Sequence, residues 1–277
     1  MKLRNIATAA IMIFSTGAFA ADTKEIVTGA MTELMINKNV DAIDDYFAEP
    51  YVQHNQQVPS GLEGLKGLAG QVIADNPAFE YEMVRSFADG DLGFVHGIYK
   101  GFGPTPLVAF DVFRVQDGKI VEHWDNLMPV AEPNPSGHTQ TDGPTEVSDR
   151  DKTDANRALV RDFIETVLVG GAFDKMPAYF DGDNYVQHNA NIGDGLSGLA
   201  AGLEAMAKAG LSMRFTKNHM VLADGNFVLA ISEGILGDKP MAFYDLFRVE
   251  KDKIAEHWDV IAPILPASEA ANDNGKF

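Results

Sequence analysis

Two stretches of this chain are near copies of each other, and this internal repeat limits the folds open to it more than any other feature. Residues 111–125 and 245–259 are identical at ten of fifteen positions, at a spacing of 134. At the same spacing the segment YVQHN occurs at 51–55 and again at 185–189. A repeat that keeps one spacing over about seventy residues indicates a duplicated domain. We therefore expect two copies of one fold.

Each copy consists of predicted helices followed by predicted strands. In the first copy, apolar residues at helical spacing predict a helix near 26–34, a short helix over 41–47 and a third helix from Gly61. Strand-like runs separated by turn-forming residues follow at 81–87, 94–99, 107–115 and 119–127. The second copy repeats this order. Helices first and strands afterwards predict the α+β class, with helices covering one face of an antiparallel sheet.

Changes in composition along the chain indicate where the two domains begin and end. Lys2 and Arg4 precede an apolar run that ends in small residues, which predicts a signal peptide over 1–20 with cleavage after Ala20. We expect domains at 22–130 and 153–266, a linker at 131–152 rich in Pro, Gly, Ser, Thr and Asp, and a flexible tail at 267–277. No later segment has the roughly 20 apolar residues of a membrane span, so we expect a periplasmic or secreted protein free of the membrane after cleavage.

The charge of the chain bears on its partners. The formal net charge is −18, and loss of the signal peptide would remove Lys2 and Arg4 as well. Such an acidic protein repels phosphate backbones, so nucleic acid is not an expected partner. The chain has no Cys, so each domain must be held by an ordinary apolar core.

The repeated segment near the end of each copy reads as a β-hairpin, and its turn decides which side chains share a face. A two-residue type I′ turn needs positive φ at both central residues, and the second copy has Lys251 and Asp252 there. We therefore predict a three-residue loop with one left-handed residue, at Gly118 or Asp252. Val115 then pairs with Lys119.

This register also pairs Asp111 with His123 and divides the hairpin into two faces. One face carries Asp111, Phe113, Val121, His123 and Asp125 in the first copy, and Asp245, Phe247, Ala255, His257 and Asp259 in the second. A carboxylate–imidazole–carboxylate cluster between apolar neighbours suits the lining of a pocket. The opposite face carries Ile120 and the only tryptophans, Trp124 and Trp258, which favours burial of the sheet backs against each other in an intramolecular pseudo-dimer.

These residues resemble a known family. The YVQHN segment, the following Gly-Leu-x-Gly-Leu and the hairpin from Asp-x-Phe-Arg-Val to Glu-His-Trp-Asp look like SnoaL-like domains, in the superfamily of nuclear transport factor 2 and ketosteroid isomerase. The resemblance implies two tandem cones, each a curved antiparallel sheet wrapped around about three helices. Members include polyketide cyclases, isomerases, dehydratases, hydrolases and binding modules, so the fold alone does not define the chemistry.

The resemblance also assigns roles to individual residues. His54, and likewise His188, matches the position of the general base in ketosteroid isomerase. Asp111, and likewise Asp245, matches the carboxyl group that donates a hydrogen bond to the oxyanion. The sequence has no obvious tyrosine donor to complete an isomerase site. With His123 and Asp125 as a supporting pair, repeated as His257 and Asp259, these groups suit aldol or isomerase chemistry on a small apolar carbonyl compound.

Other kinds of site find less support in the sequence. The chain has no phosphate-binding glycine loop and no nucleophile motif, so we expect no cofactor. The histidines and carboxylates could bind Zn or Fe, but none of the usual ligand spacings occurs, and we predict no metal. His96, His138 and His219 have no counterpart in the other copy and are expected to be surface or packing residues. The alternative to an enzyme is a non-catalytic binding or interaction module.

Overall fold

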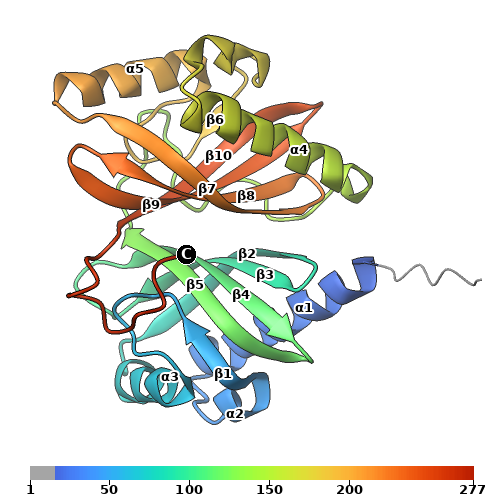
Figure 1. The fold of residues 1–277 in the computed structure, drawn as a ribbon, viewed down its shortest axis with the longest axis vertical. Helices are drawn as coiled ribbons and strands as arrows, with labels where there is room; N and C mark the ends of the chain where they lie inside the picture. The colour runs from blue at the N-terminus through green and yellow to red at the C-terminus, as the bar shows by residue number, and fades with distance from the viewer. Residues whose placement is uncertain (1–15) are drawn as a thin grey trace, which may run out of the picture.

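The computed structural model describes residues 16–277. The charged start and the apolar run of the predicted signal peptide lie outside the described residues, and the first helix, α1 (Thr16–Met31), runs through the predicted cleavage site. Figure 1 shows two domains, each with a sheet facing the middle of the molecule and helices on its outer side. Among the helices within 16–277, none combines the length and the apolar character that a membrane span needs.

Domain 1 contains three α-helices and a five-stranded sheet. After α1 and a π-helical turn, Thr32–Ile36, come α2 (Ala42–Tyr46), β1 (Phe47–Gln53), α3 (Leu62–Leu68) and a second π-helical turn, Ala69–Ala74. The remaining strands are β2 (Glu80–Asp89), β3 (Leu92–Lys100), β4 (Leu107–Gln116) and β5 (Lys119–Pro129). The strand order is β1-β5-β4-β3-β2. This is the predicted α+β order.

Domain 2 repeats this arrangement. A 3₁₀ turn, Arg150–Lys152, leads into α4 (Thr153–Phe163), a π-helical turn, Ile164–Val169, and a second 3₁₀ segment, Phe173–Ala178. The other elements are β6 (Val186–Gln187), α5 (Gly195–Lys208), β7 (Met213–Asp224), β8 (Phe227–Leu236), β9 (Lys239–Glu250) and β10 (Lys253–Pro263). The strand order is β6-β10-β9-β8-β7. Because β1 and β6 run parallel to their neighbours, both sheets are mixed rather than wholly antiparallel.

Apolar side chains on the two faces of each sheet have different partners. In domain 1 the inner face packs against α1, whose buried residues Val27, Ala30 and Met31 recur at helical spacing. The outer faces of the two sheets contribute to one apolar cluster that contains Trp124 and Trp258. These two tryptophans are therefore core residues, as predicted. The outer face of each sheet thus packs against the other domain, and the inner face packs against the helices of its own domain, where a pocket can form.

The predicted hairpin turn is wrong. Asp117 and Gly118 have φ of 51° and 77°, and Lys251 and Asp252 have φ of 52° and 59°, so both hairpins close with a two-residue turn. A turn with two left-handed residues matches the right-handed twist of a hairpin, and this fit outweighs the cost, about 1–2 kcal/mol, of the left-handed conformation at Lys251.

A β-bulge next to each turn restores the facing of the polar residues. Val115 pairs with Ile120 and Arg114 with Glu122, so Val121 is an extra residue in β5, and Ala255 is its counterpart in β10. The bulge turns Ile120 into the core, contrary to prediction. It also brings Asp111 opposite Asp125 rather than His123. All three still share the inner face, as do Asp245, His257 and Asp259, because the turn and the bulge each shift the register by one residue.

The two segments outside the domains are folded onto them. Residues 131–149 contain no helix or strand, but the side chain of Asn134 donates to the carbonyls of Gln187 and Ile192 in domain 2. The segment 267–277, predicted to be flexible, crosses to domain 1, as the dark red trace in Figure 1 shows. There Asn272 donates to the carbonyl of Val58 and Asn274 to that of Gln53. The polar composition of this segment predicted that it is flexible. Composition does not show that its asparagines reach backbone carbonyls in the other domain.

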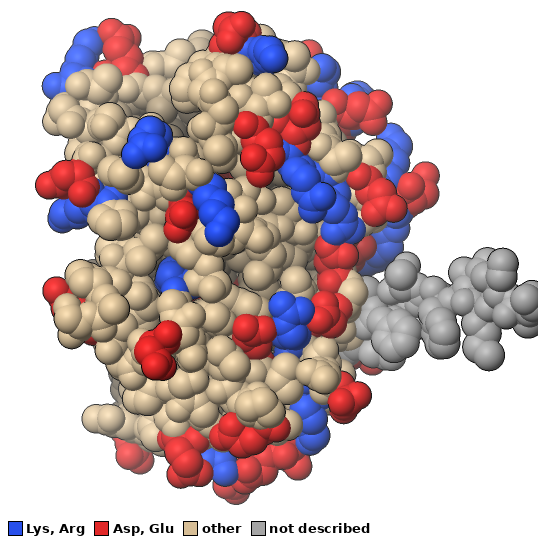
Figure 2. Space-filling model, in the orientation of Figure 1, with Lys and Arg blue, Asp and Glu red and all other residues tan. Residues whose placement is uncertain are grey.

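Charged side chains are mixed over the surface. On the face drawn in Figure 2, Lys and Arg are interspersed with Asp and Glu rather than gathered in one basic patch, and acidic groups are frequent along the lower edge, over domain 1. That face thus has no concentrated positive surface of the kind that binds phosphate backbones.

Candidate functional site

Domain 2 contains a cavity of about 700 Å³ between α5 and the inner face of its sheet. Small-molecule pockets are usually about 300–1,000 Å³ and mostly apolar. Most of the wall is apolar and includes Phe163, Met176, Leu199, Leu203, Phe215 and Phe243. The polar lining residues include Gln187, Asn189, Asp245, His257 and Asp259. An apolar cavity with convergent polar groups is the usual form of a ligand site.

The charged groups of this cavity come from the central hairpin. Asp245 on β9 lies directly opposite Asp259 on β10, and His257 lies two residues earlier on the same face. The Nε2 atom of His257 is 3.0 Å from Oδ1 of Asp245. Oδ2 of Asp245 is buried and has no hydrogen-bond partner among the described residues. The carboxylate of this cavity-lining residue thus keeps one buried oxygen without a partner in the described part of the chain.

Gln187 fixes the orientation of the His257 ring. The Oε1 atom of Gln187 accepts the backbone N–H groups of His188 and Asn189, and its Nε2 donates to the hydroxyl of Tyr185. Because Oε1 is an acceptor, Nδ1 of His257, 3.0 Å away, must carry the hydrogen. Nε2 is then the nitrogen that shares a proton with Asp245.

Burial shifts the pKa values of this cluster. Desolvation raises the pKa of Asp259, against the opposing charge of His257 and a hydrogen bond from Asn189, whose amide is 2.6 Å from Oδ2 of Asp259. Desolvation lowers the pKa of His257, but its hydrogen bond with Asp245 and the charges of both carboxylates outweigh burial and raise it. The folded state thus favours a protonated His257 and makes Asp259 easier to protonate.

Domain 1 has the same polar arrangement. Nε2 of His123 lies 3.2 Å from Asp111, Nδ1 lies 3.0 Å from Gln53, and Asn55 donates to Asp125 at 2.7 Å. Burial raises the pKa of Asp111, as it does that of Asp259. The duplicated hydrogen bonds follow directly from the duplicated sequence.

The space above the cluster differs between the domains. In domain 1 the hydroxyl of Tyr99 donates to Asp111 at 3.2 Å, and the buried Tyr99 ring packs against Phe79 and Tyr81. Tyr99 pairs with Leu107, and the residue at the same register position in domain 2 is Gly234. In domain 1 a tyrosine hydroxyl therefore donates to the carboxylate of the cluster, and domain 2 has a glycine at the corresponding position.

His54 and His188, predicted as general bases, lie on the other face of the sheet. His54 contacts Glu122 at 2.9 Å and stacks on Trp124, while His188 contacts Glu256 at 2.7 Å and stacks on Trp258. The parallel pairing of Gln53 with His123 fixes the phase of this segment. Alternate residues of an extended chain face opposite ways, so the neighbours of these histidines enter the cones.

The site residues that sequence reasoning missed belong to that same segment. Tyr, Gln and Asn alternate in YVQHN in both copies, and the structure places Tyr185, Gln187 and Asn189 along the cavity. The alternation of Tyr, Gln and Asn was the available signal, because every second residue of an extended segment lies on the same face. It could not be used because nothing in the sequence gave the phase of the segment relative to the hairpin.

Three groups of side chains among the described residues have the composition of a metal site. Two are the clusters just described, one in each domain. In both, the histidine and one aspartate already bond to each other. The third consists of His138, Asp142 and His188 and lies outside the cones.

The chain belongs to the family of SnoaL-like domains. The sequence profile of this family matches residues 28–123 and 160–257, one in each domain and together most of the chain. The structure is accordingly two tandem domains of the nuclear transport factor 2-like type. No curated protein matches the chain significantly.

Solved structures similar to this chain match about one domain each. A nuclear transport factor 2-like protein of unknown function from Mesorhizobium loti is 22% identical, with 39% of this chain and 93% of that chain covered and a TM-score of 0.35. A putative polyketide cyclase from Bacillus cereus is also 22% identical, with 38% and 74% covered and a TM-score of 0.35. An LEH-like epoxide hydrolase from M. tuberculosis is 21% identical, with 39% of this chain and 84% of that chain covered and a TM-score of 0.34.

Proposed function

We propose that domain 2 is a cofactor-independent acid–base enzyme of the cyclase or isomerase type, which acts on a small apolar carbonyl compound. The observation that carries this proposal is the position of Asp245, His257 and Asp259 on the wall of a mostly apolar cavity. Charged groups in such surroundings are costly for folding. Acid–base catalysis gives a reason for them, since it needs titratable groups beside an apolar substrate.

The geometry supports a division of roles between the two carboxyl groups. Oδ1 of Asp245 is engaged by His257, so Oδ2 would take the proton from the carbon next to the substrate carbonyl. Asp259, whose pKa burial raises, would be protonated and donate a hydrogen bond to the enolate oxygen. In an isomerisation Asp245 returns the same proton to another carbon. In an aldol closure the enolate carbon attacks a second carbonyl, and the new alkoxide takes that proton.

For domain 1 the packing favours a non-catalytic role. Tyr99 occupies the space above Asp111 with its ring and engages the carboxylate with its hydroxyl. From the tail, Lys276 donates to the backbone carbonyl of Asp125 at 2.6 Å. We propose that this domain stabilises the pair of sheets. This is the binding or interaction module considered from the sequence, assigned to one domain.

We also propose that the protein is exported, because of the charged start, apolar run and small residues at 1–20. Cell fractionation of the native host and N-terminal sequencing of the purified protein test this. We expect a mature chain that begins at Ala21, outside the cytoplasm. A full-length chain in the cytoplasmic fraction would contradict it.

Hydrogen–deuterium exchange at an activated carbon tests the proposed chemistry without knowledge of the natural substrate. The probe is 2-tetralone in D₂O, followed by NMR with wild-type protein and with Asp245→Asn. We expect exchange above the buffer rate with the wild type and its loss in the variant. If 2-tetralone binds to the wild type by ligand-observed NMR but exchanges no faster than in buffer, domain 2 is a binding module.

A further inference from the structure

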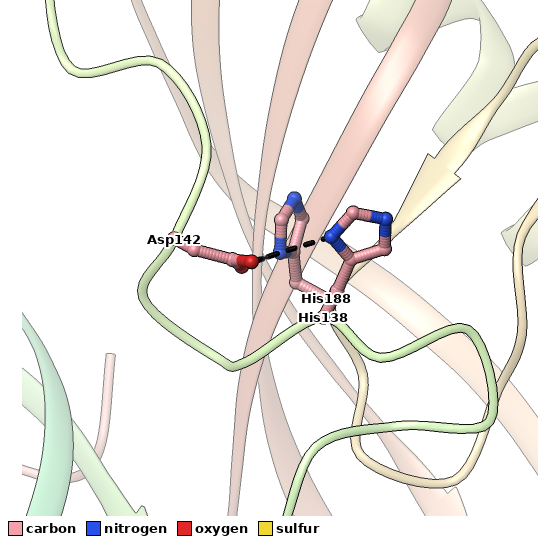
Figure 3. Close-up of side chains that lie close together, drawn as sticks. All are labelled: His138, Asp142 and His188. Carbon is pink, nitrogen blue, oxygen red and sulfur yellow. Dashed lines mark hydrogen bonds and ion pairs between the residues drawn. The ribbon is translucent and has the colours of Figure 1, made fainter.

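The linker and domain 2 meet at a cluster of two histidines and one aspartate. His138 and Asp142 belong to the linker, and His188 follows β6 (Figure 3). One oxygen of Asp142 lies 2.7 Å from Nδ1 of His188, and the other lies 3.3 Å from Nδ1 of His138. The same kind of ring nitrogen in both histidines is thus turned toward a single carboxylate.

The opposite nitrogen of each histidine contacts a further carboxylate. Nε2 of His138 lies 3.2 Å from Asp194, and Nε2 of His188 lies 2.7 Å from Glu256. Histidines that bind a metal through one nitrogen usually donate the other N–H to a carboxylate or carbonyl, which fixes the ring. Both rings of this cluster have a carboxylate at the nitrogen opposite Asp142.

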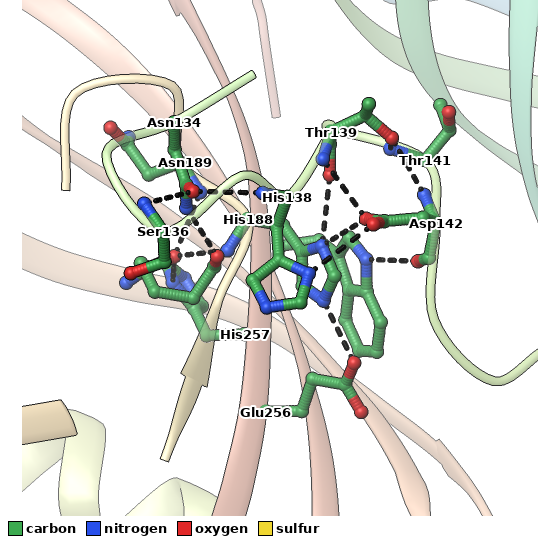
Figure 4. Close-up of polar contacts among 12 residues, drawn as sticks. Asn134, Ser136, His138, Thr139, Thr141, Asp142, His188, Asn189, Glu256 and His257 are labelled. Carbon is green, nitrogen blue, oxygen red and sulfur yellow. Dashed lines mark hydrogen bonds and ion pairs between the residues drawn. The ribbon is translucent and has the colours of Figure 1, made fainter. Parts of the chain in front are cut away.

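Other contacts hold the linker in place around the cluster (Figure 4). Asp142 Oδ1 accepts the backbone N–H of Thr139, and the carbonyl of Thr139 lies 2.8 Å from Nδ1 of His188. The backbone carbonyl of Asp142 accepts hydrogen bonds from Trp258 and from Arg85 of domain 1. The His188 side chain is fully buried, while those of His138 and Asp142 are 33% and 42% exposed. An ion can therefore reach the cluster from solvent.

The corresponding position in domain 1 lacks this composition. His54 has the same contact with a glutamate, Glu122, but its Nδ1 faces the backbone carbonyl of Gly275 at 3.1 Å. No other histidine or aspartate completes a ligand set there among the described residues. His54 is therefore a matched control for His188.

We propose that His138, Asp142 and His188 bind a divalent transition metal of the zinc class and so fasten the linker to domain 2. Two imidazole nitrogens and one carboxylate oxygen are a ligand set that suits Zn²⁺, which tolerates three protein ligands and a water molecule. Asp194 and Glu256 orient the two imidazoles. The site is separate from the proposed catalytic cluster, because His188 lies on the outer face of the sheet.

Zinc binding by the untagged mature chain tests this proposal. The protein is stripped with a chelator and titrated with ZnCl₂ by calorimetry, and bound metal is counted by mass spectrometry. We expect one Zn²⁺ per chain and a rise in melting temperature with added Zn²⁺. His138→Gln and Asp142→Asn should each weaken binding by about tenfold or more and abolish that rise, since both remove a ligand from a partly exposed position.

Two controls decide where a bound ion lies. His54→Gln and His257→Gln should bind Zn²⁺ as tightly as the wild type. The proposal is overturned if the wild type binds no Zn²⁺ at micromolar concentration. It is equally overturned if His257→Gln loses the ion while His138→Gln keeps it, because the metal would then lie in the cone.

Discussion

The two domains share a hydrogen-bond network but differ in what lies above it. Both contain the aspartate–histidine–glutamine series and the asparagine that contacts the last aspartate. Domain 1 places Tyr99 over Asp111, whereas domain 2 has Gly234 at that position and an open cavity. The same network therefore occurs beneath a buried aromatic ring in domain 1 and beside a cavity in domain 2. A polar cluster alone does not indicate catalysis in this fold, and the space beside it is the better evidence.

The largest expected difference between the domains is in activity. Asp245→Asn should lower the rate of 2-tetralone exchange by about 100-fold or more, because positioned acid–base groups contribute about 10²–10⁴. The matched change Asp111→Asn should leave that rate within about twofold. NMR exchange rates for the two variants measure this contrast. A loss of exchange in Asp111→Asn with exchange intact in Asp245→Asn would reverse the assignment of the domains.

The free energy of unfolding, in contrast to activity, should depend on Tyr99 in domain 1. Tyr99→Ala removes a buried aromatic side chain and should cost about 3–5 kcal/mol of unfolding free energy. Tyr99→Phe removes only the hydroxyl that donates to Asp111 and should cost about 1 kcal/mol. Urea unfolding monitored by fluorescence gives both values. Equal effects of the two variants would mean that the hydroxyl, not the ring, is what domain 1 requires.

A large side chain placed in the interior should affect ligand binding in domain 2 and stability in domain 1. Leu203 lines the cavity, and Leu203→Trp should weaken 2-tetralone binding by about tenfold, since it places an indole in the space for a ligand. The register of the repeat makes Ala69 its counterpart, buried in the core of domain 1. Ala69→Trp should overpack that core and cost about 1–3 kcal/mol. Similar stability losses in both variants would argue that the two interiors are equally full.

The smallest expected effect concerns pH. Because burial raises the pKa of Asp259, its contribution to stability is fully present below the unfolded-state pKa of about 4 and is lost as pH rises through the folded-state pKa. Asp259→Asn should therefore gain stability relative to the wild type as pH rises from 4 to 7. Urea unfolding at several pH values measures this difference. The exposed Asp238→Asn is the control and should show no such trend.

Much of the site could be predicted from the repeat, and the errors have local causes. Asp111, His123 and Asp125 share an inner face as predicted, although the turn was wrong, because the bulge at Val121 compensates for it. His54 was assigned to the pocket by resemblance, but it faces outward because the extended segment has the opposite phase. A register error of one residue is invisible in composition and reverses every side chain of a strand.

The sequence by itself determined the duplication, the α+β order of elements and the inner-face cluster, because identity at one spacing and apolar periodicity are local properties. The tertiary structure decided which residues meet. It placed Tyr99 above Asp111 and a glycine at the same position in domain 2, and it brought His138 and Asp142 of the linker to His188. These contacts join residues on different strands or on separate segments, so they depend on strand register and chain path, which no local pattern encodes.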